Sequence, residues 1–143
     1  MTYATQQDMI DSFGKSEIVE LTNLENPAAV AINSVPLDQA LGDASSLING
    51  YLASNYVLPL PDPYPTILTG ICCDIVRYKL DKNRQREDVR QRYEDAISFL
   101  KDVAKGLVSL GVATADQPAV DVGGVAYKSP GRVFTTDNFR GFY

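Results

Sequence analysis

The 143-residue chain contains no histidine. Carboxylates and cysteines are therefore the side chains to consider first as catalytic groups or metal ligands. Without an imidazole, a Ser-His-Asp or Cys-His nucleophile is excluded, and so are the common histidine-containing zinc sites. The two cysteines, Cys72 and Cys73, are adjacent. They therefore have neither the ligand spacing of a structural zinc site nor the geometry of a loop-closing disulfide. We expect both to be reduced and to pack as small hydrophobes.

Acid-base catalysis would need carboxylates in a perturbed environment. The acidic pairs to test for this role are Glu17 with Glu20 and Glu94 with Asp95. The first pair lies in a short predicted surface turn and the second alternates with arginines, so we expect both pairs to be solvated. The glycine-containing stretches match neither the phosphate-binding loop nor the dinucleotide fingerprint. The sequence therefore predicts no catalytic residue, no metal site and no cofactor.

Asp74 is the acidic residue with the most unusual setting, because it interrupts an apolar helical stripe that includes Ile71 and Ile75. A carboxylate on such a stripe needs a positively charged partner if it faces inward. Arg77 and Arg92 are the candidates. We predict a structural ion pair between Asp74 and one of these arginines, with a role in stability and not in catalysis.

Hydrophobic periodicity predicts a mainly α protein, a small antiparallel helical bundle with a C-terminal extended arm or β-hairpin. Thr5 is expected to cap a short helix that Gly14 ends, and Ser16 to cap a second. Pro36 suits the first position of a third helix. The three longer helices are expected near residues 36–54, 65–81 and 87–108. The second of them is apolar on more than one face, which is typical of a central helix.

Two connectors have a distinctive composition. LPLPDPYP, residues 58–65, is expected to be a stiff extended link of the polyproline type. Asp81 to Arg86 is expected to be a solvated, charged link. The chain length fits one globular unit, which we divide into a helical core at 1–110 and an arm at 111–143.

The predicted arm is rich in glycine, proline and aromatic residues. Residues 119–127 match a hairpin with a Gly-Gly turn. Four aromatic side chains close to the end cannot be buried by such a segment alone, so the arm packs either on its own core or on another subunit. The predicted partner-binding residues are Arg132, Phe134, Phe139, Arg140, Phe142 and Tyr143.

The charge distribution restricts the partners. A net charge of −5 argues against nonspecific binding to nucleic acid or to an anionic membrane. Basic side chains gather at Arg77, Lys79, Lys82, Arg84, Arg86, Arg90 and Arg92, but interspersed acids favour a mixed solvated face or a protein interface. Lys15 is the one basic residue among the first 50, against seven acidic ones. Such polarity suits head-to-tail contacts in a ring. We expect no export signal and no membrane-spanning segment.

Four segments together resemble a known family. They are YATQQDMIDSFGKSEIVELTN, INGYLASNYVLPLPDPYP followed by CCDIVRYKL, RQRYEDAISFLKDVAKG, and SPGRVFTTDNFRGF. Their order and spacing resemble the neck proteins of Mu-type bacteriophages, and the resemblance covers nearly the whole chain. The family's Asp-Ile-x-Arg-Tyr and Arg-Tyr-x-Asp-Ala motifs fall on residues 74–78 and 92–96.

The resemblance implies a virion structural protein of the neck and no enzyme. Its expected role is a ring-shaped adaptor between portal and tail, present in the host cytoplasm before assembly. The implied partners are other copies in a homo-oligomeric ring, the portal protein and a downstream neck or tail protein, with genomic DNA passing through the channel without sequence-specific binding. The alternatives are a stopper, a tail terminator, or a small cytoplasmic helical regulator or enzyme.

Overall fold

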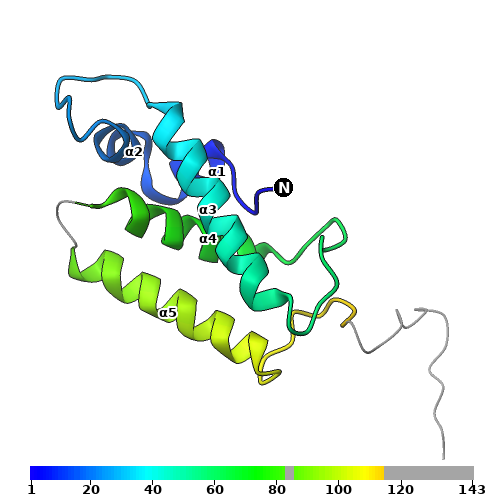
Figure 1. The fold of residues 1–143 in the computed structure, drawn as a ribbon. Coiled ribbons are helices and arrows are strands. Elements are labelled where there is room, and N and C mark those ends of the chain that lie inside the picture. Colours follow the sequence, from blue (N-terminus) through cyan, green and yellow to red (C-terminus); the bar gives the residue numbers. More distant parts are fainter. Residues whose placement is uncertain (83–85, 115–143) are drawn as a thin grey trace, which may run out of the picture.

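The computed structural model describes residues 1–82 and 86–114, and the regular secondary structure of this part of the chain is helical apart from one isolated β-bridge (Figure 1). Its helices are α1 (Gln6–Phe13), α2 (Lys15–Thr22), α3 (Ser34–Leu52), α4 (Thr66–Leu80) and α5 (Glu87–Ala104). The prediction of a mainly α protein is confirmed. None of these helices is both long and apolar enough to cross a bilayer. The hairpin predicted at 119–127 lies outside the described residues.

Helix α4 is the centre of the fold. It contacts each of the other four described helices. Helix α3 crosses over it, and α5 runs back beside it in the opposite direction (Figure 1). Leu68, Ile75 and Val76 of α4 are completely buried. The width of its apolar surface explains this position, because a helix that is apolar on several faces must be covered on each of them.

Helix α5 covers α4 with one face only. Its buried residues Val89, Ala96, Leu100 and Val103 recur at helical spacing, and its opposite face is charged. Between the two helices, the rings of Tyr78 and Tyr93 stack with centroids 3.9 Å apart and planes 11° from parallel. Such ring pairs stabilise a contact beyond the area that they bury.

The short helices α1 and α2 begin where local hydrogen bonds are available. Thr5 caps α1 as predicted, in a reciprocal capping box with Asp8. The prediction that Ser16 caps α2 is wrong. Helix α2 begins two residues earlier than that cap implies, at Lys15, and Gly14 with φ 89° occupies the cap position. This left-handed conformation favours glycine and lets α2 follow α1 directly.

The start of α3 also differs from the prediction. The helix begins at Ser34, and the side chain of Asn33 accepts a hydrogen bond of 3.2 Å from the backbone N–H of Val35. Pro36 is thus the third helical residue and not the first. Its missing N–H costs nothing there, because the N–H groups of the first turn have no partner within the helix.

The proline-rich connector between α3 and α4 is bent, so the prediction of a stiff extended link is wrong. Bends occur at residues 58–59 and 62–63, and the Leu58–Pro59 and Asp62–Pro63 peptide bonds are cis. Leu60 is only 3% exposed. A straight connector would carry this side chain into water, whereas the bent one places it in the core.

Truncating a core residue of α4 or α5 tests these assignments. We expect Ile75→Ala or Leu100→Ala to lower the free energy of unfolding by about 2–5 kcal/mol, because both side chains are completely buried. Ile67→Ala is the matched control on α4, since Ile67 is half exposed, and should cost less than about 1 kcal/mol. Chemical denaturation measures all three, and equal losses for Ile67 and Ile75 would contradict the assignment.

Candidate functional site

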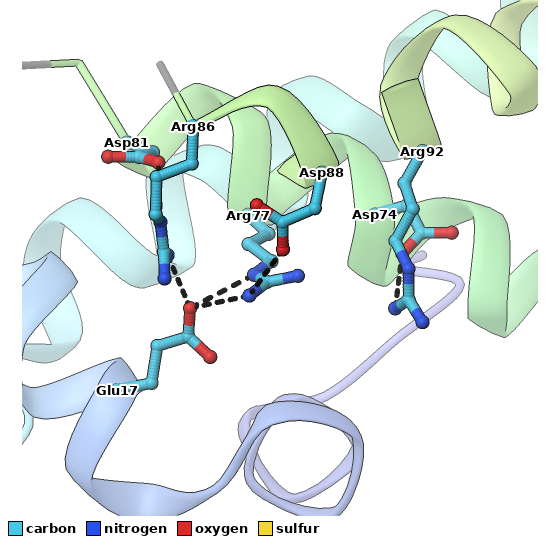
Figure 2. Close-up of polar contacts among 7 residues, drawn as sticks. All are labelled: Glu17, Asp74, Arg77, Asp81, Arg86, Asp88 and Arg92. Carbon is cyan, nitrogen blue, oxygen red and sulfur yellow. Dashed lines mark hydrogen bonds and ion pairs between the residues drawn. The ribbon is translucent and has the colours of Figure 1, made fainter. Parts of the chain in front are cut away.

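The most extensive polar cluster in the described residues is built around the carboxylate of Glu17 on α2. Nε and Nη2 of Arg77 on α4 donate hydrogen bonds to its Oε1, at 3.0 and 2.8 Å. Arg86, which immediately precedes α5, donates a third hydrogen bond to the same oxygen (Figure 2). One carboxylate therefore binds two guanidinium groups that are 60 and 69 residues away in the sequence.

Further groups extend this cluster. Arg86 Nε lies 3.3 Å from Oδ2 of Asp81 at the end of α4, and Arg77 Nη2 lies 3.7 Å from Oδ2 of Asp88 on α5. We call Glu17, Arg77, Asp81, Arg86 and Asp88 the charged network. It joins α2 to the end of α4 and the start of α5.

The aromatic ring of Phe13 connects α1 to the charged network. The guanidinium carbon of Arg77 lies 4.5 Å from the centre of this ring, within the range of a cation–π interaction. Arg77 itself is buried, with 8% of the residue exposed. Its charge is therefore compensated by a carboxylate on one side and contacted by an aromatic face on another, as a buried cation requires.

Asp81 corrects the prediction of a solvated link from Asp81 to Arg86. Its residue exposure is only 4%, because α4 ends against the rest of the protein and the bond from Arg86 folds the next segment back over it. Residues 83–85 of this link lie outside the described residues.

The ionisation of Glu17 reflects its two arginines. Burial alone raises the pKa of this carboxyl group, but the hydrogen bonds and charges of Arg86 and Arg77 together outweigh burial. The pKa of Glu17 is therefore below its ordinary value. The pKa of Arg86 is raised, chiefly by its hydrogen bond to Glu17. Both directions indicate that the network favours the ionised form of each group.

Glu17 was expected to be solvated, and that prediction is wrong. Its side chain is 20% exposed, because two arginines from distant parts of the chain cover it. One signal for the network was present in the sequence. Arg77 follows Cys73 by four residues and precedes Leu80 by three, and both are buried, so Arg77 had to face inward and required an acidic partner.

The structure pairs Asp74 with Arg92, while Arg77 influences Asp74 through its charge. The distance from Arg92 Nη1 to Asp74 Oδ1 is 3.6 Å, and the two side chains are 57% and 26% exposed. Burial raises the pKa of Asp74, although the charges of Arg92 and Arg77 oppose this effect. The pair is therefore long and partly solvated, whereas Arg77 binds Glu17.

The remaining predicted positions divide into surface pairs, buried thiols and undescribed residues. On the exposed face of α5, Arg90 pairs with Glu87 at 2.8 Å and approaches Glu94 at 4.0 Å. This part of the basic cluster is therefore a mixed charged surface. Cys72 and Cys73 are buried and unpaired. Burial raises the pKa of both thiols, that of Cys73 to about 12, which disfavours the reactive thiolate. Arg84, Arg132, Phe134, Phe139, Arg140, Phe142 and Tyr143 lie outside the described residues.

The arrangement of the charged network is suited to holding helices together. Within residues 1–82 and 86–114, no buried side-chain polar atom lacks a hydrogen-bond partner, and no group of acidic residues and cysteines could hold a metal ion. Each charge of the network faces a charge of opposite sign. The network thus fixes α1 and α2 to the α4–α5 pair.

Removing the charge of Glu17 tests this role. We expect Glu17→Gln to lower the free energy of unfolding by about 1–3 kcal/mol at neutral pH, because Arg77 would keep its burial but lose its anionic partner. Glu87→Gln is the matched control, since this exposed pair with Arg90 should contribute almost nothing to stability. Equal effects of the two variants in denaturant titrations would show that the network is not important for stability.

The same pair of proteins should differ in their response to acid. A carboxyl group with a lowered pKa in the folded state stabilises the fold above its unfolded pKa, and this contribution is lost as pH falls through the folded value. The stability difference between the parent and Glu17→Gln should therefore be full above about pH 6 and should shrink below about pH 4. A difference that is constant from pH 7 to pH 3 would contradict this ionisation.

For Asp74 we expect stability to change with pH in the opposite direction. With its pKa raised, the stabilising contribution is present in the protonated state and is lost as pH rises through the folded pKa. Asp74→Asn should therefore leave the free energy of unfolding at pH 7 almost unchanged, with a loss of no more than about 0.5 kcal/mol. Thermal and chemical denaturation measure this, and a loss above about 1 kcal/mol would mean that the pair with Arg92 is strongly stabilising.

Comparison with known proteins identifies the family of this chain. The family model described as Bacteriophage Mu, Gp36 matches residues 3–128. A Mu-like prophage FluMu protein gp36 from Haemophilus influenzae is 36% identical over 140 residues, which cover 98% of this chain and 97% of the relative. Gene product J of Escherichia phage Mu is 32% identical over 112 residues, 78% of each chain. The family-model match extends through all five described helices, and the chain therefore belongs to the bacteriophage Mu Gp36 family.

Proposed function

We propose that this protein is a structural component of the phage neck, where copies form a ring-shaped adaptor between portal and tail during head-to-tail joining. Its membership of the Mu Gp36 family carries the proposal. The resemblance of its motifs to Mu-type neck proteins supplies the position in the particle. The protein is a virion component after assembly and lies in the host cytoplasm before it.

The charged and titratable groups in the interior of the structure support an architectural role. The inward-facing cation Arg77 is bonded to Glu17, and the buried thiols have raised pKa values. These groups stabilise the contacts between helices. The proposed role is accordingly that of a structural part of an assembly.

Its surface supports contacts with other proteins. Large apolar side chains are exposed near both ends of the helical bundle, among them Val30 and Val35 at one end and Leu107 at the other. Apolar side chains that gain burial on association are a favourable component of an interface. The proposed partners are further copies in a homo-oligomeric ring, the portal protein and the next neck or tail protein. DNA passes through the ring without sequence-specific contacts.

The decisive experiment deletes the gene from a Mu-like phage and examines the particles by electron microscopy. An adaptor mutant should accumulate heads and complete tails that remain separate, and an in vitro mixture should yield joined particles only after the purified protein is added. Supplying the wild-type gene in trans is the control. This result would show that the protein is needed to join heads to tails and is not needed to form either of them.

Other outcomes identify the alternatives. Heads that package DNA and then lose it would indicate a stopper, and tails of abnormal length would indicate a tail terminator. Normal joined particles would contradict a structural role in the neck and leave a small cytoplasmic regulator. The mass of the purified protein with and without portal protein gives a second test, because an adaptor should form a larger complex only when portal is present.

A further inference from the structure

The loop between α2 and α3 has an apolar surface that the described residues do not cover. Val30 is 88% exposed and Val35 74% exposed, and Leu24 also reaches the surface. Valine and leucine side chains at one place on a surface are suited to contact with another apolar group. This loop is therefore a candidate contact surface.

A groove lies beside the same loop. It encloses about 820 Å³ between α2 and residues 23–30, and Val19, Leu24, Ala29 and Val30 provide apolar lining. The charged network closes one side through Glu17 and Arg86. A hollow of this size accepts more than one aromatic side chain. The groove is thus large enough to hold a short segment of another chain, and it offers that segment both apolar and polar lining.

The position of the arm suggests which segment that is. The described chain reaches Thr114, which forms an antiparallel bridge with Tyr56 just after α3. This point and the α2–α3 loop lie at opposite ends of the bundle (Figure 1). Residues 115–143 thus continue from the end remote from the groove, and the sequence of their last part contains Phe134, Phe139 and Phe142.

A molecule with an arm at one end and a groove at the other has two different surfaces that can meet in neighbouring copies. Contacts of this head-to-tail kind form closed rings when the rotation between copies closes. The apolar lining suits the phenylalanines.

We propose that residues 129–143 of one copy dock in the groove between α2 and residues 23–30 of the next copy. The inference deepens the proposed function, because it rests on the ring and names the contact that closes it. Phenylalanine side chains of the arm enter the groove beside Val30.

Photocrosslinking in phage-producing cells tests this contact. The full-length chain carries benzoylphenylalanine in place of Val30, and a second preparation carries it at Lys101, an exposed position on α5. After irradiation, mass spectrometry identifies the peptide joined to each position. We expect the Val30 probe to give a product with the mass of two copies, joined within residues 129–143, and the Lys101 probe to give none.

The other outcomes overturn the contact. A product of single-copy mass would mean that the arm folds back on its own groove. A product with the portal or another protein would give the groove a different occupant, while the neck role could still stand. Absence of any product at Val30 would show that the groove is empty. Separate heads and tails in the deletion phage report on the function itself, so the two failures are distinguishable.

A pair of variants provides an independent check in the same phage. Val30→Asp should reduce the yield of joined particles at least tenfold, because a carboxylate would enter an apolar contact. Lys101→Asp introduces the same carboxylate at an exposed position on α5, away from the groove, and should leave the yield within twofold. Circular dichroism confirms that both variants fold, and equal yields would contradict the proposed contact.

Discussion

The carboxylate of Glu17 connects the two parts of this fold. Helices α1 and α2 are short, and isolated helices of this length are unstable in water. Glu17 binds Arg77 of α4 and Arg86 before α5, and the ring of Phe13 contacts Arg77. The position of α2, and with it the loop and groove that follow, depends on these contacts. A buried cation without Glu17 would favour separation of α2 from the bundle.

This dependence relates the interior of the protein to its proposed assembly. The groove that we assign to a neighbouring arm has α2 as one wall and the charged network at its side. Because α2 is held in place, the loop that carries Leu24 and Val30 starts from a fixed position, which lowers the entropic cost of docking. The charges are therefore used inside the protomer, while apolar side chains remain available for contacts between copies. This division is consistent with a structural member of the Mu Gp36 family.

Local sequence patterns predicted the helices. They did not predict the features that depend on contacts between distant segments of the chain. The apolar stripes around Ile75 and Leu100 are local properties, and both residues are buried as their periodicity indicates. The Thr5 cap is equally local. Glu17, in contrast, looked like a surface residue because its arginines are distant in sequence. The bend that buries Leu60 was missed for the same reason, since the core that attracts it is formed by other segments.

The most direct measurement of the central claim is a cryo-electron microscopy reconstruction of the neck of the intact phage. We predict copies of the α1–α5 bundle arranged as a ring between portal and tail, with density from each copy reaching the α2–α3 loop of its neighbour. A neck that contains no such bundle, or a bundle found only in the capsid shell or at the far end of the tail, would contradict the account.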